Sequence, residues 1–211
     1  MSLRASAAIA TLLAVLGAPP VAAEPYRLAP FKDDLFKYPA VLDTQDNGAF
    51  VVVGYDKARD LHKRDEVPER RARLQYVSPV SQRTGTFAVD GLTLKYIGAG
   101  KIDGGASAVV IYVHGQGGSR YQGANEWMFG GNFNRIMNLM VRNNGAYLSP
   151  DFSDLGDKGA REIKALLLEQ AAKSPAAAIF VACGSQGGAI CWQLARDPAV
   201  TPRLGGLLLL G

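Results

Sequence analysis

One short segment constrains the fold of this chain more than any other: the glycine-rich turn Cys183-Gly184-Ser185-Gln186-Gly187-Gly188. An apolar run over 176–182 precedes it and a helix-like stretch begins at Ala189, so the turn joins a strand to a helix. A sharp turn of this kind raises its central side chain out of the edge of a sheet. The pattern therefore predicts that Ser185 is a nucleophile.

A second glycine-rich turn, His114-Gly115-Gln116-Gly117-Gly118, follows the strand-like run Ala108–Val113. Its glycines allow backbone conformations that are closed to bulkier residues, and its backbone N–H groups can point at a negatively charged oxygen. Two such turns in this order along the chain predict acyl transfer.

Short apolar runs alternate with longer amphipathic ones from Ala106 onward, which is typical of βαβ units with a parallel sheet. The expected strands cover 108–113, 146–149, 177–182 and 206–210, and the expected helices cover 132–142, 158–173 and 187–195. Strands that are apolar on both faces belong inside a sheet covered by helices on both sides. The predicted fold class is therefore α/β, with a doubly wound, mostly parallel sheet. Both glycine-rich turns and Pro150-Asp151 then lie on one rim, at the carboxyl ends of the strands.

Upstream, the turn dipeptide Asp90-Gly91 lies between two strand-like pieces, 87–89 and 92–97, and predicts an antiparallel hairpin that begins the sheet. A further strand is expected over Phe50–Val53, whereas the mixed charges of residues 56–73 favour a solvated helix or loop.

The composition indicates how many domains the chain forms and which partners are expected. A chain of 211 residues with 48% hydrophobic residues forms one domain with a sizeable core. Its net charge of +4 is spread along the sequence, so we expect no nucleic-acid partner. We expect no cofactor and no metal either, and the sequence does not indicate an oligomeric state.

The first 23 residues are typical of a secretory signal. Arg4 gives a positive start, residues 5–18 are apolar, and Val21-Ala22-Ala23 offers small residues for cleavage before Glu24. The apolar stretch is shorter than an ordinary membrane span, although an uncleaved signal anchor is the alternative. The prediction is a secreted or periplasmic protein with no stable membrane anchor, in which residues 24–85 form an N-terminal extension and residues 86–211 form the main domain.

The chain has two cysteines, Cys183 and Cys191, on either side of the serine turn. One is expected at a strand end and the other well into the following helix, pointing elsewhere. We therefore expect buried free thiols rather than a disulfide.

Residues 87–211 resemble the α/β-hydrolase superfamily, through the serine turn above all and the earlier glycine-rich turn next. In that family the nucleophile turn has small residues two positions on either side of the nucleophile, and here Cys183 replaces the usual first glycine. The resemblance implies a small-molecule ester or related acyl substrate. It also implies that the backbone N–H groups of Gln186 and Gln116 bind the oxyanion that forms when Ser185 attacks.

The resemblance assigns supporting roles to four more residues. Gly115 and Gly117 shape the oxyanion turn, Gly187 lets the helix approach the sheet, and His114 supports the turn from behind rather than acting as a base. The other histidine, His62, lies in the charged upstream segment and is expected to be exposed.

The chain departs from the family in one respect. The family order is nucleophile, then acid, then histidine. In this sequence Asp197 is the only acidic residue after Ser185, and no histidine follows it. We expect a C-terminally incomplete hydrolase that is nearly inactive as written, since a serine without a base is a weak nucleophile. The alternatives are a complete non-catalytic binding or scaffold protein on the same fold, and a turn that binds phosphate or a nucleotide.

Nearby polar and aromatic residues have simpler interpretations. Asp154 or Asp157 is expected to cap the next helix, and Asp151 lies on the rim. An aromatic group is expected to pack in the core or a lid; its members are Trp127, Phe129 and Phe133.

Overall fold

The computed structural model describes residues 28, 41–54, 80–125 and 132–210. Strands β1 (Val41–Gln45) and β2 (Phe50–Val53) form an antiparallel hairpin, which confirms the predicted strand over 50–53. Several predictions lie outside the described residues: the signal segment, the charged stretch 56–73 with His62, and the aromatic residues Trp127 and Phe129.

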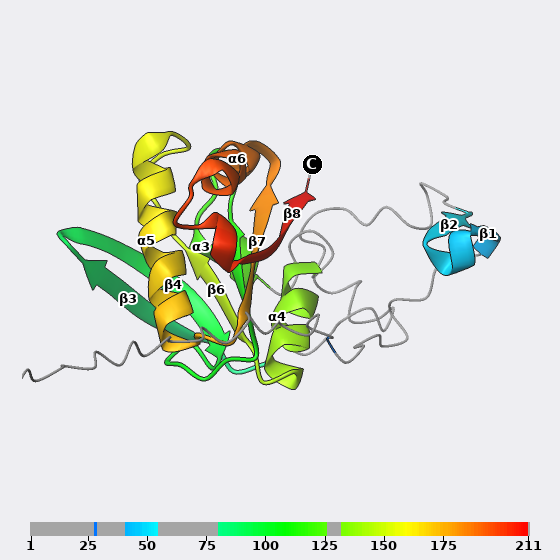
Figure 1. Cartoon of the computed structure of the whole chain (residues 1–211), viewed down its shortest axis with the longest axis horizontal. Coiled ribbons are helices and arrows are strands. Elements are labelled where there is room, and N and C mark those ends of the chain that lie inside the picture. The colour runs from blue at the N-terminus through cyan, green and yellow to red at the C-terminus, as the bar shows by residue number, and fades with distance from the viewer. Residues whose placement is uncertain (1–27, 29–40, 55–79, 126–131, 211) are drawn as a thin grey trace, which may run out of the picture.

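The main sheet has six strands in the order β3-β4-β6-β5-β7-β8 (Figure 1). Their bounds are β3 Arg83–Val89, β4 Leu92–Gly100, β5 Ala108–Val113, β6 Ala146–Pro150, β7 Ala178–Gly184 and β8 Leu204–Leu210. Strands β6, β5, β7 and β8 are parallel, whereas β4 is antiparallel to both β3 and β6. The predicted α/β class with a mostly parallel sheet is confirmed, and β3 begins before the predicted domain boundary at residue 86.

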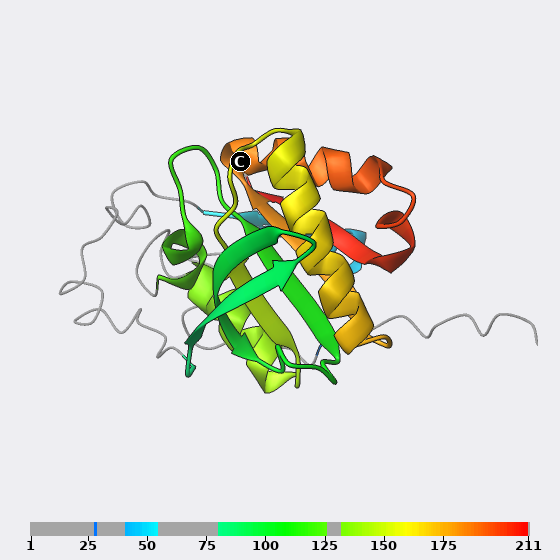
Figure 2. The ribbon, with the colours of Figure 1, turned by 90° about the vertical axis from the view of Figure 1, so that its left-hand side faces the viewer.

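The β3–β4 hairpin closes through the predicted turn. Asp90 and Gly91 both have positive φ, 47° and 78°, as a type I′ turn requires at its two central residues. Figure 2 shows this hairpin in front of the parallel strands.

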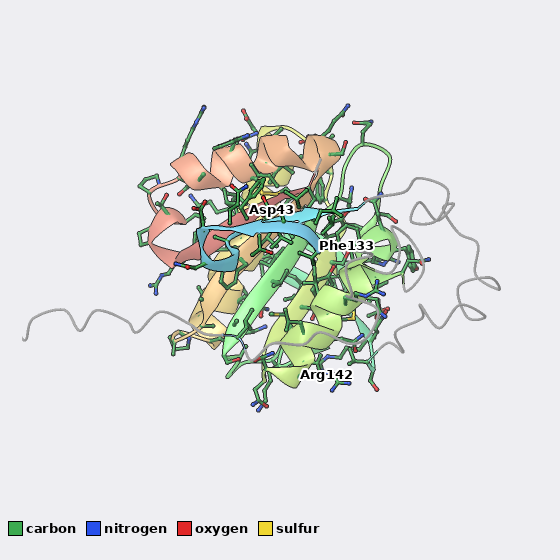
Figure 3. All side chains as sticks on the ribbon, turned by 90° about the vertical axis from the view of Figure 1, so that its right-hand side faces the viewer. Asp43, Phe133 and Arg142 are labelled. Atoms are coloured by element: carbon green, nitrogen blue, oxygen red, sulfur yellow. A yellow bond between two sulfur atoms is a disulfide. The ribbon has the colours of Figure 1, made fainter. Side chains whose placement is uncertain are left out.

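Helices cover both faces of the sheet. Their bounds are α3 Arg120–Ala124, α4 Asn132–Arg142, α5 Asp157–Lys173 and α6 Gly188–Arg196, and single 3-10 turns cover Asp46–Gly48 (η2), Ser185–Gly187 (η4) and Thr201–Arg203 (η5). The predicted helices at 132–142, 158–173 and 187–195 are confirmed to within about two residues. Figure 3 looks onto the side of the sheet that carries α4, with Phe133 near its first turn and Arg142 at its end.

Alternation along the central strand explains the two layers of core. In β5, Val109, Ile111 and Val113 belong to the cluster that contains the inner faces of α5 and α6. The intervening Val110 and Tyr112 pack with Phe133 and other residues of α4 on the opposite face. Because every β5 residue is buried, this strand is apolar throughout, as a central strand between two helical layers must be. The sequence predicted that Phe133 packs either in the core or in a lid. It packs in this core, against Tyr112.

The free-thiol prediction is wrong, because Cys183 and Cys191 form a disulfide. Cys191 lies in the first turn of α6, on the helix face that packs back over β7, so its side chain points at the sheet. The two Cα atoms are 6.2 Å apart, within the range that a disulfide spans.

No helix among the described residues combines the length and the apolar character needed to cross a bilayer.

Candidate active site

Ser185 is the first residue of η4, directly after the end of β7 and before α6. Its side chain is exposed, although Cys183 and Gly184 before it and Gly187 after it are buried. Its φ of +49° lies in the left-handed region, which costs a non-glycine residue on the order of 1–2 kcal/mol. The turn is therefore strained and presents its hydroxyl at the rim, as the sequence pattern predicts for a raised serine.

The two glycine-rich turns meet at Gly115. A methyl group added there would lie 3.0 Å from the Gly184 carbonyl oxygen, 3.1 Å from Ser185 Cβ and 3.6 Å from the Gln186 nitrogen. These distances place the backbone of the first turn directly against the serine turn. The prediction that both turns share one rim is confirmed.

Gly187 allows the start of α6 to pack against the end of β5. A Cβ at this position would lie 2.7 Å from the His114 carbonyl oxygen and 2.8 Å from that of Val113. Such distances are below normal contact, so only glycine fits. The close approach predicted for Gly187 is therefore present.

The two residues predicted to supply backbone donors, Gln186 and Gln116, lie one on each glycine-rich turn. Gln186 lies in the first turn of a helical segment, where N–H groups have no partner within the helix. Gln116 is exposed, and among the described residues no backbone hydrogen bond uses its N–H. The turn around Gln116 is closed by the Gly118 N–H, which donates to the Gly115 carbonyl over 3.0 Å, and by Gly117 at φ +67°.

His114 is buried beneath this turn, with 7% of its surface exposed. Its Nδ1 lies 2.9 Å from the Gly115 carbonyl oxygen, and because a carbonyl only accepts, Nδ1 carries the proton. The ring stacks on Phe152 with centroids 4.1 Å apart. These contacts hold the ring beneath the turn, and within the described part of the chain no hydrogen bond joins Ser185 to a histidine.

Sequence reasoning missed the polar contacts that anchor the helix after the first turn. Asp151 accepts the Arg120 backbone N–H at 2.6 Å and forms an ion pair with the Arg120 guanidinium. This hydrogen-bonded pairing raises the pKa of Arg120 above its usual value. The Ser149 hydroxyl donates to the Arg120 carbonyl at 2.7 Å, and the Tyr147 hydroxyl donates to the Gly123 carbonyl at 2.7 Å. The end of β6 thus holds α3, and with it one end of the Gln116 turn.

Two other aspartates have structural roles. Asp154 accepts the N–H groups of Gly159 and Gly156, at 3.0 and 2.9 Å, which lowers its pKa and satisfies an N–H group in the first turn of α5, whose N-cap residue is Gly156. Asp197 receives a hydrogen bond of 2.5 Å from Lys164, which lowers its pKa and ties the end of α6 to α5. Asp157 is the first residue of α5.

Among the described residues, no group of three or more histidine, cysteine or acidic side chains is arranged to hold a metal ion.

Tyr112 lies under the serine turn and offers a pH-dependent prediction. Its hydroxyl would be 2.7 Å from a Cβ on Gly184, and burial raises its pKa to about 12. Between pH 10 and 12 the unfolded chain loses this proton while the folded chain keeps it, so stability falls as pH rises, by at most about 1.4 kcal/mol per pH unit. Tyr112→Phe removes this contribution but also removes the hydrogen bond to Gln122, worth about 1 kcal/mol.

We therefore expect Tyr112→Phe to be less stable than the wild type at pH 8, to match it at about pH 11 and to be the more stable of the two at pH 12, in urea unfolding followed by circular dichroism. Tyr121→Phe, at a tyrosine that is 58% exposed, is the control. A stability difference that stays constant across this pH range would contradict the prediction.

No family model matches the sequence, and no curated protein matches it. Solved structures are similar over part of the chain. A fungal esterase from Rhizomucor miehei is 22% identical, with 68% of this chain and 48% of that one covered at a TM-score of 0.47. An epoxide hydrolase from Vigna radiata is 15% identical, with 62% and 38% covered at 0.45. A haloalkane dehalogenase variant from Bradyrhizobium elkanii is 25% identical, with 61% and 40% covered at 0.43.

The chain thus spans less than half the length of these three structures. The fold of the described residues is a mostly parallel α/β sheet in which β4 alone runs antiparallel to both of its neighbours, and glycine-rich turns follow β5 and β7.

Proposed function

We propose that this chain belongs to a serine hydrolase that cleaves an ester or a related acyl compound through Ser185. The observation that carries the proposal is the exposed, left-handed Ser185 lying against the backbone of the Gly115 turn. A serine with left-handed backbone angles between a strand and a helix lowers stability, and such strain is a reason to look for function at that residue.

The proposed chemistry has two steps. Ser185 Oγ bonds to the acyl carbon while a base takes its proton, and the base then gives that proton to the departing oxygen, so that an alcohol leaves when the ester C–O bond breaks. Water then attacks the acyl-serine, releasing the carboxylic acid and restoring the hydroxyl. In both steps the charged oxygen would be bound by the N–H groups of Gln186 and Gln116. We assign no base among the described residues.

We also propose that the protein is exported, to the periplasm or the exterior, because residues 1–23 have the composition of a secretory signal. The Cys183–Cys191 disulfide supports this, since structural disulfides persist mainly in oxidising compartments.

The oxyanion assignment can be tested because the proposed donors are backbone groups. In the full-length protein, Gln116→Ala keeps the N–H and should leave fluorophosphonate labelling of the serine within a few-fold of the wild type. Gln116→Pro removes the N–H and should slow labelling by about 100- to 1000-fold. Peptide mapping identifies the labelled residue, and circular dichroism verifies folding of both variants.

Equal labelling rates for the two variants would remove Gln116 from the proposal. A wild-type protein that takes up no label would instead favour a non-catalytic binding protein on this fold.

A further inference from the structure

We infer that the Cys183–Cys191 disulfide is a positioning element of the site, which holds Ser185 in its reactive conformation. The inference rests on the proposed function, because it assigns a task to a bond that surrounds the proposed nucleophile. Cys183 is two residues before Ser185 and Cys191 is six residues after it. The bond therefore closes a small ring that contains the whole serine turn.

The ring contains the part of the backbone that most needs restraint. Ser185 has φ +49°, and without restraint a serine would relax toward a negative φ. On one side the turn is held by close packing, since Gly187 lies against the carbonyl groups of Val113 and His114. Packing also holds α6 against β7, because both contribute to the same buried cluster, but it leaves the two elements without a covalent connection across the turn.

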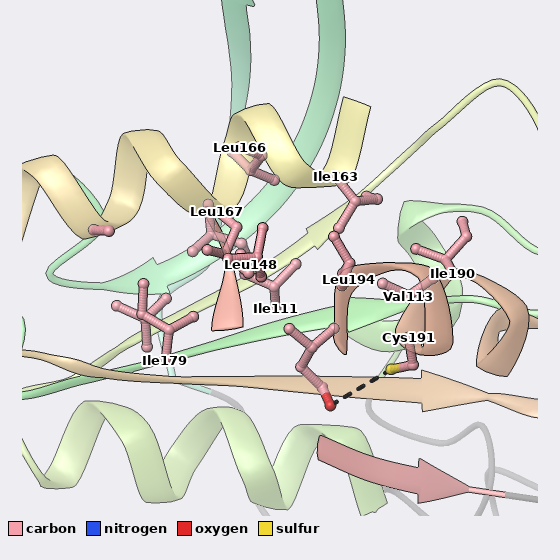
Figure 4. Packing of buried hydrophobic residues seen from close by; sticks show 14 of the residues in the cluster. Ile111, Val113, Leu148, Ile163, Leu166, Leu167, Ile179, Ile190, Cys191 and Leu194 are labelled. Atoms are coloured by element: carbon pink, nitrogen blue, oxygen red, sulfur yellow. Dashed lines mark hydrogen bonds between the residues drawn. The ribbon is translucent and has the colours of Figure 1, made fainter. Parts of the chain in front are cut away.

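The disulfide makes that second connection. Both cysteines are buried, at 1% and 0% exposure, in the cluster shared by β7 and α6. Cys191 Sγ lies 3.9 Å from the Val181 carbonyl oxygen, so the first turn of α6 rests directly on β7 (Figure 4). With the strand and the helix covalently joined, the intervening turn cannot lengthen or rotate to relieve its left-handed residue.

The position of this disulfide also distinguishes it from a bond that only stabilises the fold. A cross-link that closed a longer loop in the same cluster would stabilise the domain as much or more, but it would not bracket the strained residue. Loss of this bond should therefore displace Ser185 Oγ relative to the Gln116 and Gln186 N–H groups. A displacement of about 1 Å at a reacting group can lower a rate on the order of 100-fold.

The test compares fluorophosphonate labelling rates in the full-length protein. The double variant Cys183→Ala/Cys191→Ala lacks the bond and leaves no free thiol. Cys183→Val/Cys191→Ala also lacks it but restores side-chain volume on β7. Met137→Ala is the matched control, because this fully buried residue packs in the other core cluster, on the opposite face of the sheet. Rates are normalised to the folded fraction, well below the unfolding temperature of every variant.

We expect both disulfide-free variants to label on the order of 10- to 100-fold more slowly than the wild type, and Met137→Ala to label at the wild-type rate. With an ester substrate, kcat should fall while KM changes little, because the bond positions the nucleophile rather than the bound substrate.

Wild-type labelling rates in folded disulfide-free variants would overturn the inference and leave the proposed function intact. So would the failure of both variants to fold, since the bond would then serve the fold as a whole. An equal loss in Met137→Ala would assign the effect to stability. Absence of labelling in the wild type would contradict the proposed function itself.

Discussion

Replacement of Ser185 by alanine in the full-length protein is expected to abolish fluorophosphonate labelling and to lower ester hydrolysis by at least about three orders of magnitude. The hydroxyl oxygen is the atom that would bond to phosphorus as fluoride leaves, and loss of a serine nucleophile alone costs about as much as loss of the whole catalytic group. The residue is exposed at the rim, so removal of its hydroxyl leaves no buried partner unsatisfied. Folding should therefore be unchanged, as measured by thermal unfolding.

Ser81→Ala is the matched control, because Ser81 is also exposed and lies just before β3, outside both glycine-rich turns. It should label like the wild type. Labelling that persists in Ser185→Ala would remove Ser185 as the nucleophile and leave the strained turn without a catalytic explanation.

Gly187→Ala is expected to lower the free energy of unfolding by about 1–3 kcal/mol, the usual range for overpacking. The added methyl would lie 2.7 and 2.8 Å from two backbone carbonyl oxygens, which cannot move without shifting β5. The same shift would separate the two glycine-rich turns, so labelling of Ser185 should also slow by about tenfold or more.

The next residue supplies the control. A methyl on Gly188 meets nothing within 4 Å, and Gly188 is the first residue of α6. Gly188→Ala should therefore be neutral or should stabilise the protein by up to about 1 kcal/mol, because alanine favours the helix. Urea unfolding of the two variants under identical conditions measures both effects. Equal effects at the two positions would contradict the assigned packing of Gly187.

Periodicity explains why much of the fold could be predicted. The bounds predicted for residues 108–113 and 132–142 coincide with β5 and α4, because burial on both faces requires a continuous apolar run and a one-sided helix requires an amphipathic one. The Asp90-Gly91 turn was equally predictable, since few residue types tolerate two consecutive positive φ angles.

The contacts that could not be predicted depend on how elements cross in space. Cys191 faces Cys183 because α6 folds back over β7, and the spacing of the two residues along the chain does not specify that angle. The Arg120–Asp151 pair joins residues far apart in sequence, on α3 and after β6, and neither has a local pattern that marks it. The five-residue helix α3 is too short to show periodicity.

The β3–β4 hairpin extends beyond the end of β6, the strand that pairs with β4. Pairing of β4 with β6 begins at Tyr96 and Pro150, so residues 92–95 continue beyond the end of β6 toward the tip at Gly91. A side chain at Gly91 would meet nothing within 4 Å. The tip of the hairpin therefore offers an attachment point for a fluorophore or an affinity handle that would report on the rim.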